Sequence, residues 1–265
     1  MGPSDPGTGE PAPGDDDAGA MPNDDASAPP GSDAGPNKAA WFGAARCANS
    51  GLAFCDSFEA AGIDANKWTI EKNGSNTATL DTAQHARGNK SLKLHFVGNT
   101  NFQYAWLSTL KPFDQVPALQ SHVFGRLFYR MDKVPTKNMH WTTIEVDGPL
   151  ANGTNARLRY GGEYDNFMAN YVTGAGEMGK FSKTPFPANQ WTCIEWEYEK
   201  ATNTMRLWSD EALVADIEVT DPKWIHPKYD KLYVGWQNYQ PNLVVPMNVW
   251  IDDVAVNGTR IGCTK

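Results

Sequence analysis

Apolar and polar residues alternate in short segments along most of this chain, and this alternation constrains its fold more than any other feature. Clear examples are residues 91–96 (Ser-Leu-Lys-Leu-His-Phe) and 141–146 (Trp-Thr-Thr-Ile-Glu-Val). A period of two, with many β-branched and aromatic residues, predicts strands that bury one face. Further segments with this pattern are 125–131, 156–160, 191–199, 204–208, 231–236 and 248–256.

Turn-forming residues separate the predicted strands. Asn-Gly or Asp-Gly pairs stand at 73–74, 147–148, 152–153 and 257–258, and such pairs favour tight hairpin turns. About a dozen strands at this spacing predict an all-β fold in which two antiparallel sheets pack as a sandwich. The best candidates for short helices are residues 60–68 and 117–121.

The first 38 residues differ in composition from the rest of the chain. They hold eight acidic residues and one lysine, a net charge of −7, whereas the whole chain has a net charge of −8. They also hold 8 of the 18 prolines and no aromatic residue. Such a segment buries too little apolar surface to offset its chain entropy. We therefore expect a disordered acidic tether over residues 1–40 and one domain over residues 41–265.

Composition and missing motifs exclude several classes of function. No stretch approaches the ~18 consecutive apolar residues of a membrane-spanning helix, and a nearly neutral domain lacks the basic face that binds nucleic acid. The motifs GxxxxGKS/T, HExxH and GxSxG, which mark nucleotide, metalloprotease and serine-hydrolase sites, do not occur. We expect a monomer that has neither a nucleic-acid partner nor a membrane-spanning segment.

Four cysteines favour an oxidising compartment. Cys47 and Cys55 flank a turn-rich loop, Cys193 lies in a predicted strand and Cys263 follows the last one. We expect the disulfides Cys47–Cys55 and Cys193–Cys263; a Cys55–Cys263 pairing and four reduced thiols are the alternatives. The cysteines and the tether predict a secreted or cell-surface-tethered protein. Its signal segment is not part of this chain, whose start lacks a charged and an apolar region.

Motifs near both ends of the domain point to one family. They are Cys-Asp-Ser-Phe-Glu at 55–59, His-Ala-Arg-Gly-Asn-Lys-Ser-Leu at 85–92, Val-Trp-Ile-Asp-Asp-Val-Ala-Val at 249–256 and Thr-Arg-Ile-Gly-Cys at 259–263. Over residues 47–263 the chain resembles the concanavalin A-like jelly-roll family of secreted cellulose-induced proteins, which is related to glucuronan lyases and alginate lyases. The resemblance implies a jelly-roll sandwich over residues 41–265, a carbohydrate-active domain and a polysaccharide partner.

The resemblance also implies a structural calcium ion that ties the first strand to the last. It assigns Glu59 and Asp252 as ligands, with Asp253 or Asp56 in reserve and backbone carbonyls of the 87–90 turn completing the shell. Calcium takes six to eight oxygen ligands of these kinds. Because adjacent strand residues point to opposite faces, we expect only one of Asp252 and Asp253 to face inward. The alternative is a pair of solvated acids beside a turn.

Cleavage of a uronate-containing polysaccharide by β-elimination is the first hypothesis for the activity. It needs a group that neutralises the uronate carboxylate, a base for the C5 proton and an acid for the leaving oxygen. His140 opens a predicted strand, and Arg159 precedes Gly161 and Gly162, where small residues leave room for a ligand. The predicted catalytic residues are His140, Arg159, Tyr164 and Asn170. The predicted substrate-binding residues are Gln103, Trp106, Arg157, Asn166, Trp236 and Gln237.

Two alternatives compete with this hypothesis. Glu195, Glu197 and Glu199 alternate on one strand, similar to the acidic signature of laminarinase-like glycoside hydrolases. A disulfide at Cys193 would crowd that face, and a solvated outer strand face explains the same pattern. The other alternative is a non-catalytic carbohydrate-binding module, in which aromatic rings stack on sugars. Its candidate residues are Tyr104, Trp106, Trp236 and Tyr239, with Gln237 and Asn238 as hydrogen-bonding partners.

Overall fold

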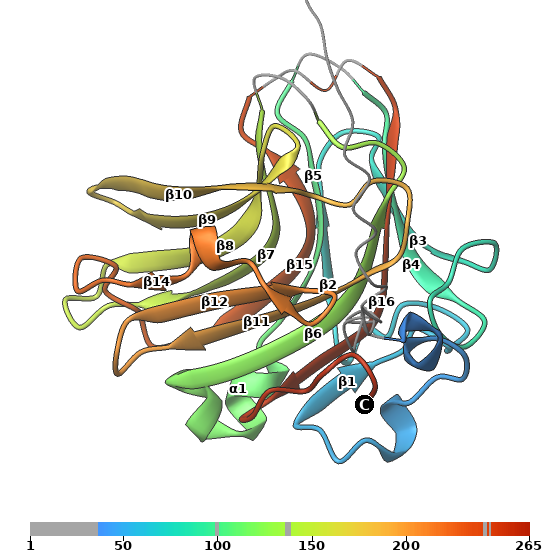
Figure 1. Cartoon of the computed structure of the whole chain (residues 1–265), viewed down its shortest axis with the longest axis horizontal. Coiled ribbons are helices and arrows are strands. Elements are labelled where there is room, and N and C mark those ends of the chain that lie inside the picture. The colour runs from blue at the N-terminus through green and yellow to red at the C-terminus, as the bar shows by residue number, and fades with distance from the viewer. Residues whose placement is uncertain (1–36, 99–100, 136–138, 241–242, 244) are drawn as a thin grey trace, which may run out of the picture. The chain divides into compact units, whose positions relative to one another are not determined.

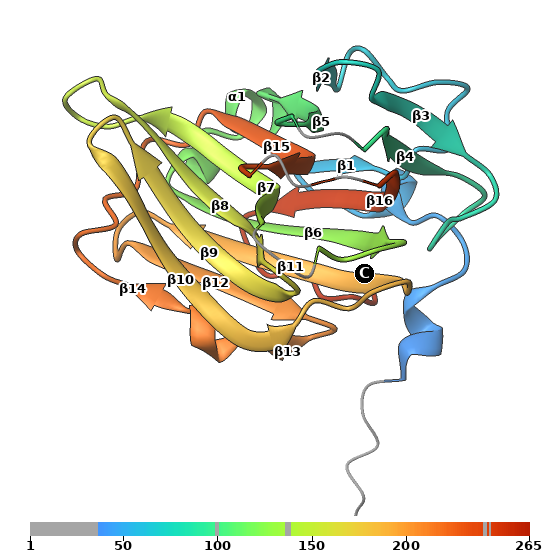
Figure 2. The same ribbon diagram turned by 90° about the horizontal axis from the view of Figure 1, so that it is seen from above.

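The computed structural model describes residues 37–98, 101–135, 139–240, 243 and 245–265. In these residues the strands form two antiparallel sheets that face each other across an apolar core (Figures 1 and 2). Strands that are distant in sequence lie side by side, as β6 (His122–Met131) does with β16 (Met247–Asn257). The predicted all-β jelly-roll sandwich is therefore confirmed.

The smaller sheet has seven strands among the described residues, and β7 is at its centre. In spatial order the strands are β10 (Gly176–Pro185), β9 (Asn166–Thr173), β8 (Asn155–Glu163), β7 (His140–Pro149), β15 (Lys231–Asn238), β5 (Tyr104–Thr109) and β2 (Thr69–Lys72).

The larger sheet has nine strands in the described part of the chain. Its main path is β13 (Ala212–Leu213), β12 (Thr204–Ser209), β11 (Thr192–Glu199), β6, β16, β4 (Ser91–Phe96) and β3 (Thr77–Asp81). In addition, β1 (Phe54–Asp56) pairs with β16 and β14 (Val219–Thr220) pairs with β12. The helices are short: α1 (Lys111–Gln115) and the 3-10 helices η1 (Lys38–Trp41), η2 (Cys47–Asn49), η3 (Pro117–Gln120) and η4 (Ala215–Ile217).

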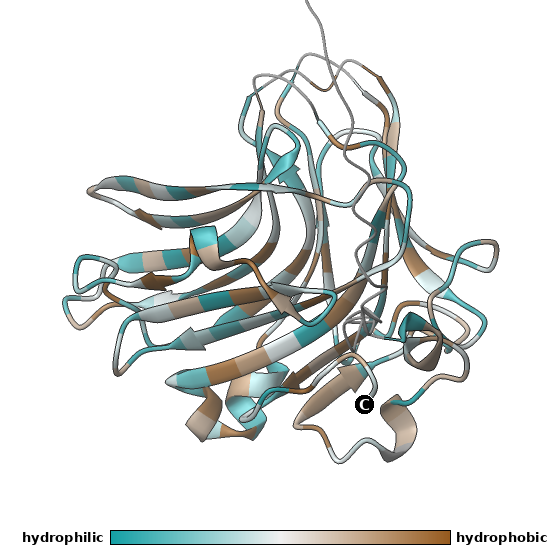
Figure 3. Ribbon diagram, in the orientation of Figure 1, coloured by the Kyte–Doolittle hydropathy of each residue, from teal (hydrophilic) through white to brown (hydrophobic). Residues whose placement is uncertain are grey.

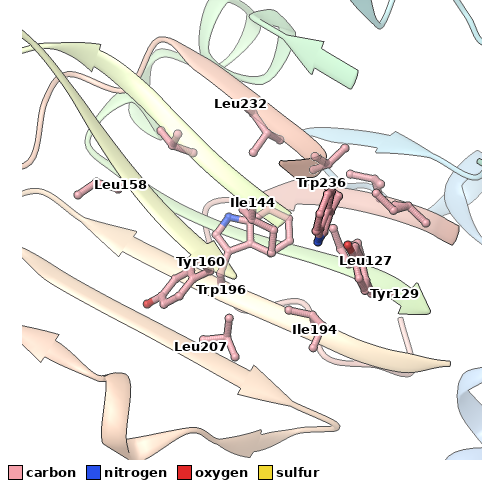
Figure 4. Close-up of a cluster of buried hydrophobic side chains, with 14 of the residues drawn as sticks. Leu127, Tyr129, Ile144, Leu158, Tyr160, Ile194, Trp196, Leu207, Leu232 and Trp236 are labelled. Carbon is pink, nitrogen blue, oxygen red and sulfur yellow. The ribbon is translucent and has the colours of Figure 1, made fainter. Parts of the chain in front are cut away.

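The core between the sheets is built from every second residue of the strands. Figure 3 shows the alternation as teal and brown bands along strands such as β6. Ile144 and Tyr160 from the smaller sheet point toward Leu127 and Trp196 from the larger one (Figure 4). Each fully buried side chain of this kind contributes about 1.5–3 kcal/mol relative to an exposed one. Burial of one face therefore fixes the strand register, and with it the residues of the opposite face.

The helix predictions were right at one place and wrong at another. Residues 117–120 form η3, as predicted, but residues 60–68 form turns and bends. Phe58 has a φ of 56°, and both Asp56 and Asp64 accept hydrogen bonds from backbone N–H groups two residues further on. Such local bonds from Asp compete with a helix. The helix α1 was not predicted because five residues are too few for a periodic pattern.

Both predicted disulfides are present, Cys47–Cys55 and Cys193–Cys263. The second bridge closes a 70-residue separation, which the loop-entropy estimate values at about 4 kcal/mol. Trp41, the first residue of the predicted domain, packs beside this bridge and is buried. Residues 1–36 of the predicted tether lie outside the described residues. Among those described, no helix has the length and apolar character to span a membrane.

Candidate functional site

The outward side of the seven-stranded sheet carries the candidate site, which we call the polar face. Because Ile144, Leu158 and Ala169 point into the core, their strand neighbours point outward. One row of outward residues crosses four adjacent strands: Tyr233 of β15, Glu145 of β7, Arg159 of β8 and Asn170 of β9 are direct partners in register. Figure 2 shows these strands side by side. The row brings together two predicted catalytic residues, Arg159 and Asn170.

Arg159 is held on the polar face by an acid and an aromatic ring. Its Nε donates a hydrogen bond to the buried carboxylate of Glu145, and its guanidinium lies 5.0 Å from the ring centre of Tyr239. Burial is the largest single effect on Arg159 and lowers its pKa, but the charge of Glu145, the interaction with Tyr239 and the hydrogen bond to Glu145 together outweigh it, so that the net pKa is raised. The Nη groups of Arg159 form no hydrogen bond with any residue that the structure describes. They are the donors available to a ligand.

Sequence analysis names Tyr239 only as a residue that could stack on a sugar ring. The structure places it beside the guanidinium of Arg159. Its hydroxyl lies 3.1 Å from Oγ1 of Thr142, on the neighbouring strand β7. Burial raises the pKa of Tyr239 to about 12, although the charge of Arg159 acts in the opposite direction. The phenol is therefore protonated at neutral pH. No sequence signal distinguishes Tyr239 from the other tyrosines, because its position depends on the loop that follows β15.

His140 lies at the start of β7, close to Tyr239 through the backbone: the amide of Tyr239 donates to the carbonyl of His140 at 2.9 Å. An acid lies directly across the strand pair from His140. Its Nε2 lies 2.9 Å from Oε1 of Glu163, the directly opposite residue of β8. Its ring also lies 5.9 Å from that of Phe181 on β10. The structure therefore gives His140 a carboxylate partner that could orient its ring.

The other two predicted catalytic residues differ in their surroundings. Asn170 is 2% exposed, its Nδ2 donates to Glu177, and its Oδ1 is buried without a hydrogen-bond partner among the described residues. Tyr164 is 39% exposed at the β8–β9 turn, with a φ of 54°. Its side chain has no hydrogen bond or ring contact within the described part of the chain. The geometry therefore associates Asn170 with Arg159 and leaves Tyr164 at the margin.

A small cavity of about 170 Å³ lies at the other end of the polar face. Its aromatic lining includes Trp106, whose ring lies 6.0 Å from that of Tyr233, and the 42% exposed Phe102. Three predicted substrate-binding residues, Trp106, Arg157 and Gln237, line this cavity. The full lining is Glu71, Phe102, Tyr104, Trp106, Glu145, Arg157, Tyr233 and Gln237.

Trp236 is wrongly predicted as a substrate-binding residue. It is 0% exposed and lies in the core (Figure 4), with its ring 4.8 Å from that of Phe96. The reason is its register partner Ala105, which also faces inward. Gln103 is buried too, and both polar atoms of its amide lack a partner among the described residues. It does not line the cavity.

Two further expectations about the polar face concern Asn166 and the paired glycines. Asn166 begins β9 opposite Glu163 and is half-buried. Gly161 and Gly162 do not open room for a ligand, because a Cβ on either residue would collide with Trp141, at its backbone or its ring. These glycines instead allow β8 to approach β7 closely.

The fixed charges of the polar face do not form a basic surface. Three cations, Arg157, Arg159 and Lys231, are accompanied by five acids, which gives 3 − 5 = −2. The acids are Glu71, Glu145, Asp147, Glu163 and Glu177. Glu145 is shared, since its Oε1 lies 3.7 Å from Nε of Arg157 while Oε2 binds Arg159. Burial and the charge of Glu145 raise the pKa of Asp147, as expected where acids crowd together.

The predicted calcium ligands Glu59 and Asp252 meet at the same turn. Glu59 accepts hydrogen bonds from the amides of Asn89 and Lys90 at 2.9 and 3.0 Å. Oδ2 of Asp252 accepts from the amides of Ala86 and Arg87 at 2.8 and 2.9 Å. Its Oδ1 is buried without a partner among the described residues, and burial raises the pKa of Asp252 to about 8. A buried carboxylate oxygen without a partner fits a cation ligand.

The reserve ligands fit less well. Asp253 is fully engaged by two arginines, with Arg87 Nη1 at 2.7 Å and Arg126 Nη2 at 3.0 Å, so its prediction as a metal ligand is wrong. The expectation that only one of Asp252 and Asp253 faces inward is also wrong. Asp253 has a φ of 48°, and the register of β16 shifts after Asp252, which buries both side chains. Asp56 is engaged by the indole of Trp68 at 2.7 Å.

The acidic residues that suggested glycoside hydrolysis lie on the outer side of the larger sheet. Two of them are buried and paired, since Glu195 binds Arg260 at 2.7 Å and Glu197 lies 2.9 Å from both His122 and Arg206, while Glu199 is half-exposed. Cys193 shares their face, as predicted, and its disulfide with Cys263 occupies it. Carboxylates paired in this way serve the structure of the sheet, so the hydrolase alternative loses its basis.

Comparisons with known proteins agree with this fold. The family model described as polysaccharide lyase-like, Cip1-like core domain, matches residues 57–259. Among curated protein sequences, none matches the chain significantly.

Solved structures of three proteins illustrate the shared fold. Cellulose induced protein Cip1 is 24% identical with a TM-score of 0.63, over 79% of this chain and 99% of its own. Endo-beta-1,4-glucuronan lyase from the fungus Trichoderma reesei is 12% identical with a TM-score of 0.55, over 78% and 96%. The binding domain of botulinum neurotoxin DC, in complex with rat synaptotagmin II, is 12% identical with a TM-score of 0.50, over 74% and 44%. From the family match, which spans most of the domain, we conclude that this chain belongs to the Cip1-like family of polysaccharide lyase-like proteins.

Proposed function

We propose that this protein is exported, binds a polysaccharide on its polar face and cleaves uronate-containing chains by β-elimination. The observation that carries the proposal is the setting of Arg159. Glu145 holds its Nε and Tyr239 lies against its guanidinium, so the Nη groups are the donors left for a ligand. A guanidinium fork of this kind binds a carboxylate through two parallel hydrogen bonds. Its charge lowers the energy of the carbanion that forms when C5 loses its proton.

The proton transfers are assigned to Tyr239, which lies against this guanidinium, and to His140, whose carbonyl accepts the amide of Tyr239. Because the pKa of Tyr239 is raised to about 12, its phenol suits the acid that protonates the leaving glycosidic oxygen. Glu163 lies 2.9 Å from Nε2 of His140 and would keep the ring proton on that nitrogen. Nδ1 of His140 would then act as the base that removes the C5 proton. The unpartnered Oδ1 of Asn170 would accept a hydrogen bond from a sugar hydroxyl.

Variants of the two tyrosines test this assignment. Tyr239→Phe should lower the rate of elimination about 10²-fold or more, as the loss of a general acid does, whereas the matched variant Tyr164→Phe should keep the wild-type rate. Arg159→Lys should lower the rate by about 10²–10³-fold, because an ammonium cannot reproduce the fork. The readout is the ultraviolet absorbance of the unsaturated product. Equal rates for Tyr239→Phe and Tyr164→Phe would exclude Tyr239 from the chemistry.

Non-catalytic carbohydrate binding is the second candidate. Two observations favour it: the fixed charges of the polar face sum to −2, with Glu145 shared between Arg157 and Arg159, and aromatic rings line the cavity. Aromatic faces suit neutral sugars. In this case the protein would be retained by insoluble polysaccharide, and neither unsaturated products nor new reducing ends would appear.

A structural cation at Glu59 and Asp252 is also part of the proposal. Both carboxylates converge on the turn at residues 86–90, and the unpartnered Oδ1 of Asp252 supports an oxygen-ligated ion such as calcium. Such an ion would supply positive charge that permits Asp252 to be ionised while buried, and would thereby tie β16 to the turn before β4.

A further inference from the structure

A second group of ligand-type side chains lies on the outer side of the larger sheet, away from the polar face. His122 of β6 and Glu199 of β11 are direct register partners, and Glu197 precedes Glu199 by two residues on the same face. The potential ligand atoms of these three side chains all lie within 4.8 Å of one another. Figures 1 and 2 show β11 between β6 and β12, in the interior of the sheet. A rigid pair of strands therefore presents one imidazole and two carboxylates together.

Neighbouring residues orient both carboxylates. Arg206 of β12 donates to Oε2 of Glu197 at 2.9 Å, which leaves Oε1 directed toward Nε2 of His122 at 2.9 Å. The hydroxyl of Thr202 donates to Oε2 of Glu199 at 2.6 Å, which leaves the other oxygen of that carboxylate available. Metal ligands in proteins are commonly held by outer partners of this kind. The arrangement thus has three oriented donors and an outer layer that fixes them.

The charges around this group are unbalanced. Glu197, Glu199 and Glu218 carry three negative charges. Arg206, which binds both Glu197 and Glu218, and Lys180, whose ammonium donates to the carbonyl of Glu218, carry two positive charges, so the sum is 2 − 3 = −1 with His122 neutral. A bound cation would offset this negative charge where Glu197 is largely excluded from water and a negative charge is poorly solvated.

We propose that His122, Glu197 and Glu199 bind a divalent first-row transition metal, of the class represented by Zn²⁺. An imidazole nitrogen in the ligand set favours such a metal over calcium or magnesium, which prefer oxygen ligands. The side chain of His122 is 39% exposed, so water completes the coordination at the open side. This site differs from the one at Glu59 and Asp252, which offers carboxylate oxygens only.

The proposal is tested by titrating the chelator-treated, dialysed full-length protein with zinc chloride in a calorimeter. We expect one ion per chain, with affinity reduced about tenfold or more in His122→Gln and in Glu199→Gln. Thr202→Val removes the hydroxyl that donates to Glu199, and it should weaken zinc binding by about 10–100-fold. The matched control is His95→Gln, since His95 lies on the same sheet but binds Asn248 at 2.9 Å; it should bind zinc as the wild type does.

Cobalt(II) binding gives a second, spectroscopic readout that does not rely on the heat of binding. Bound in a site with three protein ligands, it should give visible absorption bands in the wild type and in His95→Gln, and these bands should be lost in His122→Gln. The half-exposed position of Glu199 makes Glu199→Gln a folded alternative if the histidine variant is unstable. Absence of zinc binding in the wild type, or equal affinity in the wild type, His122→Gln and Glu199→Gln, would overturn the proposal.

Discussion

Two adjacent aspartates illustrate how differently buried charges are compensated in this protein. Asp253 has an arginine on each carboxylate oxygen, whereas Asp252 receives two backbone amides on one oxygen and nothing from the described residues on the other. The pKa of Asp252 is accordingly raised to about 8. Compensated pairs hold the sheet together, and uncompensated oxygens mark positions where an ion or a ligand would lower the energy.

His226 should make the protein less stable in mild acid. Burial, followed by the charge of Lys200, lowers its pKa to about 3, whereas a histidine in the unfolded chain titrates near ~6.5. Because the unfolded state binds the proton more readily, stability is lost as the pH falls from about 6.5 toward about 3. The loss attributable to His226 should approach roughly 1.4 kcal/mol per pH unit in that window. Urea unfolding at several pH values checks this, with His226→Asn expected to show a shallower decline.

Variants of two aromatic residues allow the contribution of core packing to stability to be measured separately from the contribution of the cavity to polysaccharide binding. Trp236→Ala should lower the free energy of unfolding by about 3–5 kcal/mol, because it empties a fully buried position. Phe102→Ala should change that free energy little, since Phe102 is 42% exposed, but should weaken retention on polysaccharide because Phe102 lines the cavity. Denaturant melts and affinity electrophoresis measure the two effects. If Phe102→Ala is retained on polysaccharide as strongly as the wild type, the cavity is not part of the binding site.

At the scale of the elements, strand pairing decides which predictions from the sequence could succeed. Alternation located β4, β6, β7 and β11 because apolar residues that point into the core alternate with polar residues along each of them. It missed β10, whose residues are mostly exposed, so that no apolar stripe marks them.

The candidate site was only partly predictable for a related reason. The register of β7 shifts between Thr142 and Ile144, and that of β15 shifts after Val234. Such shifts change which face a residue occupies, and a sequence pattern does not reveal them.

Removal of bound cations should loosen the connection between β16 and the turn at residues 86–90. A chelator should lower the melting temperature of the wild type, and added calcium should restore it by mass action. Glu59→Gln and Asp252→Asn should abolish this response, whereas Asp56→Asn, which affects a carboxylate bound to Trp68, should retain it. Differential scanning calorimetry gives the result. If the two ligand variants respond to calcium as the wild type does, the ion binds elsewhere.

On the scale of the whole molecule, the two outer sides of the sandwich differ. The larger sheet carries η1, the Cys193–Cys263 bridge and paired acids such as Glu195. The outward side of the smaller sheet brings together Arg159, which is 4% exposed, Tyr239 and His140, which come from distant parts of the chain. The fold class was predictable because it follows from burial alone, whereas this convergence depends on how the strands are ordered in the sheet.

The central claim is that the polar face eliminates across a uronate linkage, and one measurement tests it most directly. Purified protein is incubated with a panel of uronate-containing and neutral polysaccharides while the ultraviolet absorbance is followed. The account predicts a steady rise with at least one uronate polymer, no rise with neutral polymers, and loss of the rise in Tyr239→Phe. No rise with any uronate polymer, together with retention of the protein on a neutral one, would contradict the lyase assignment and establish a binding protein.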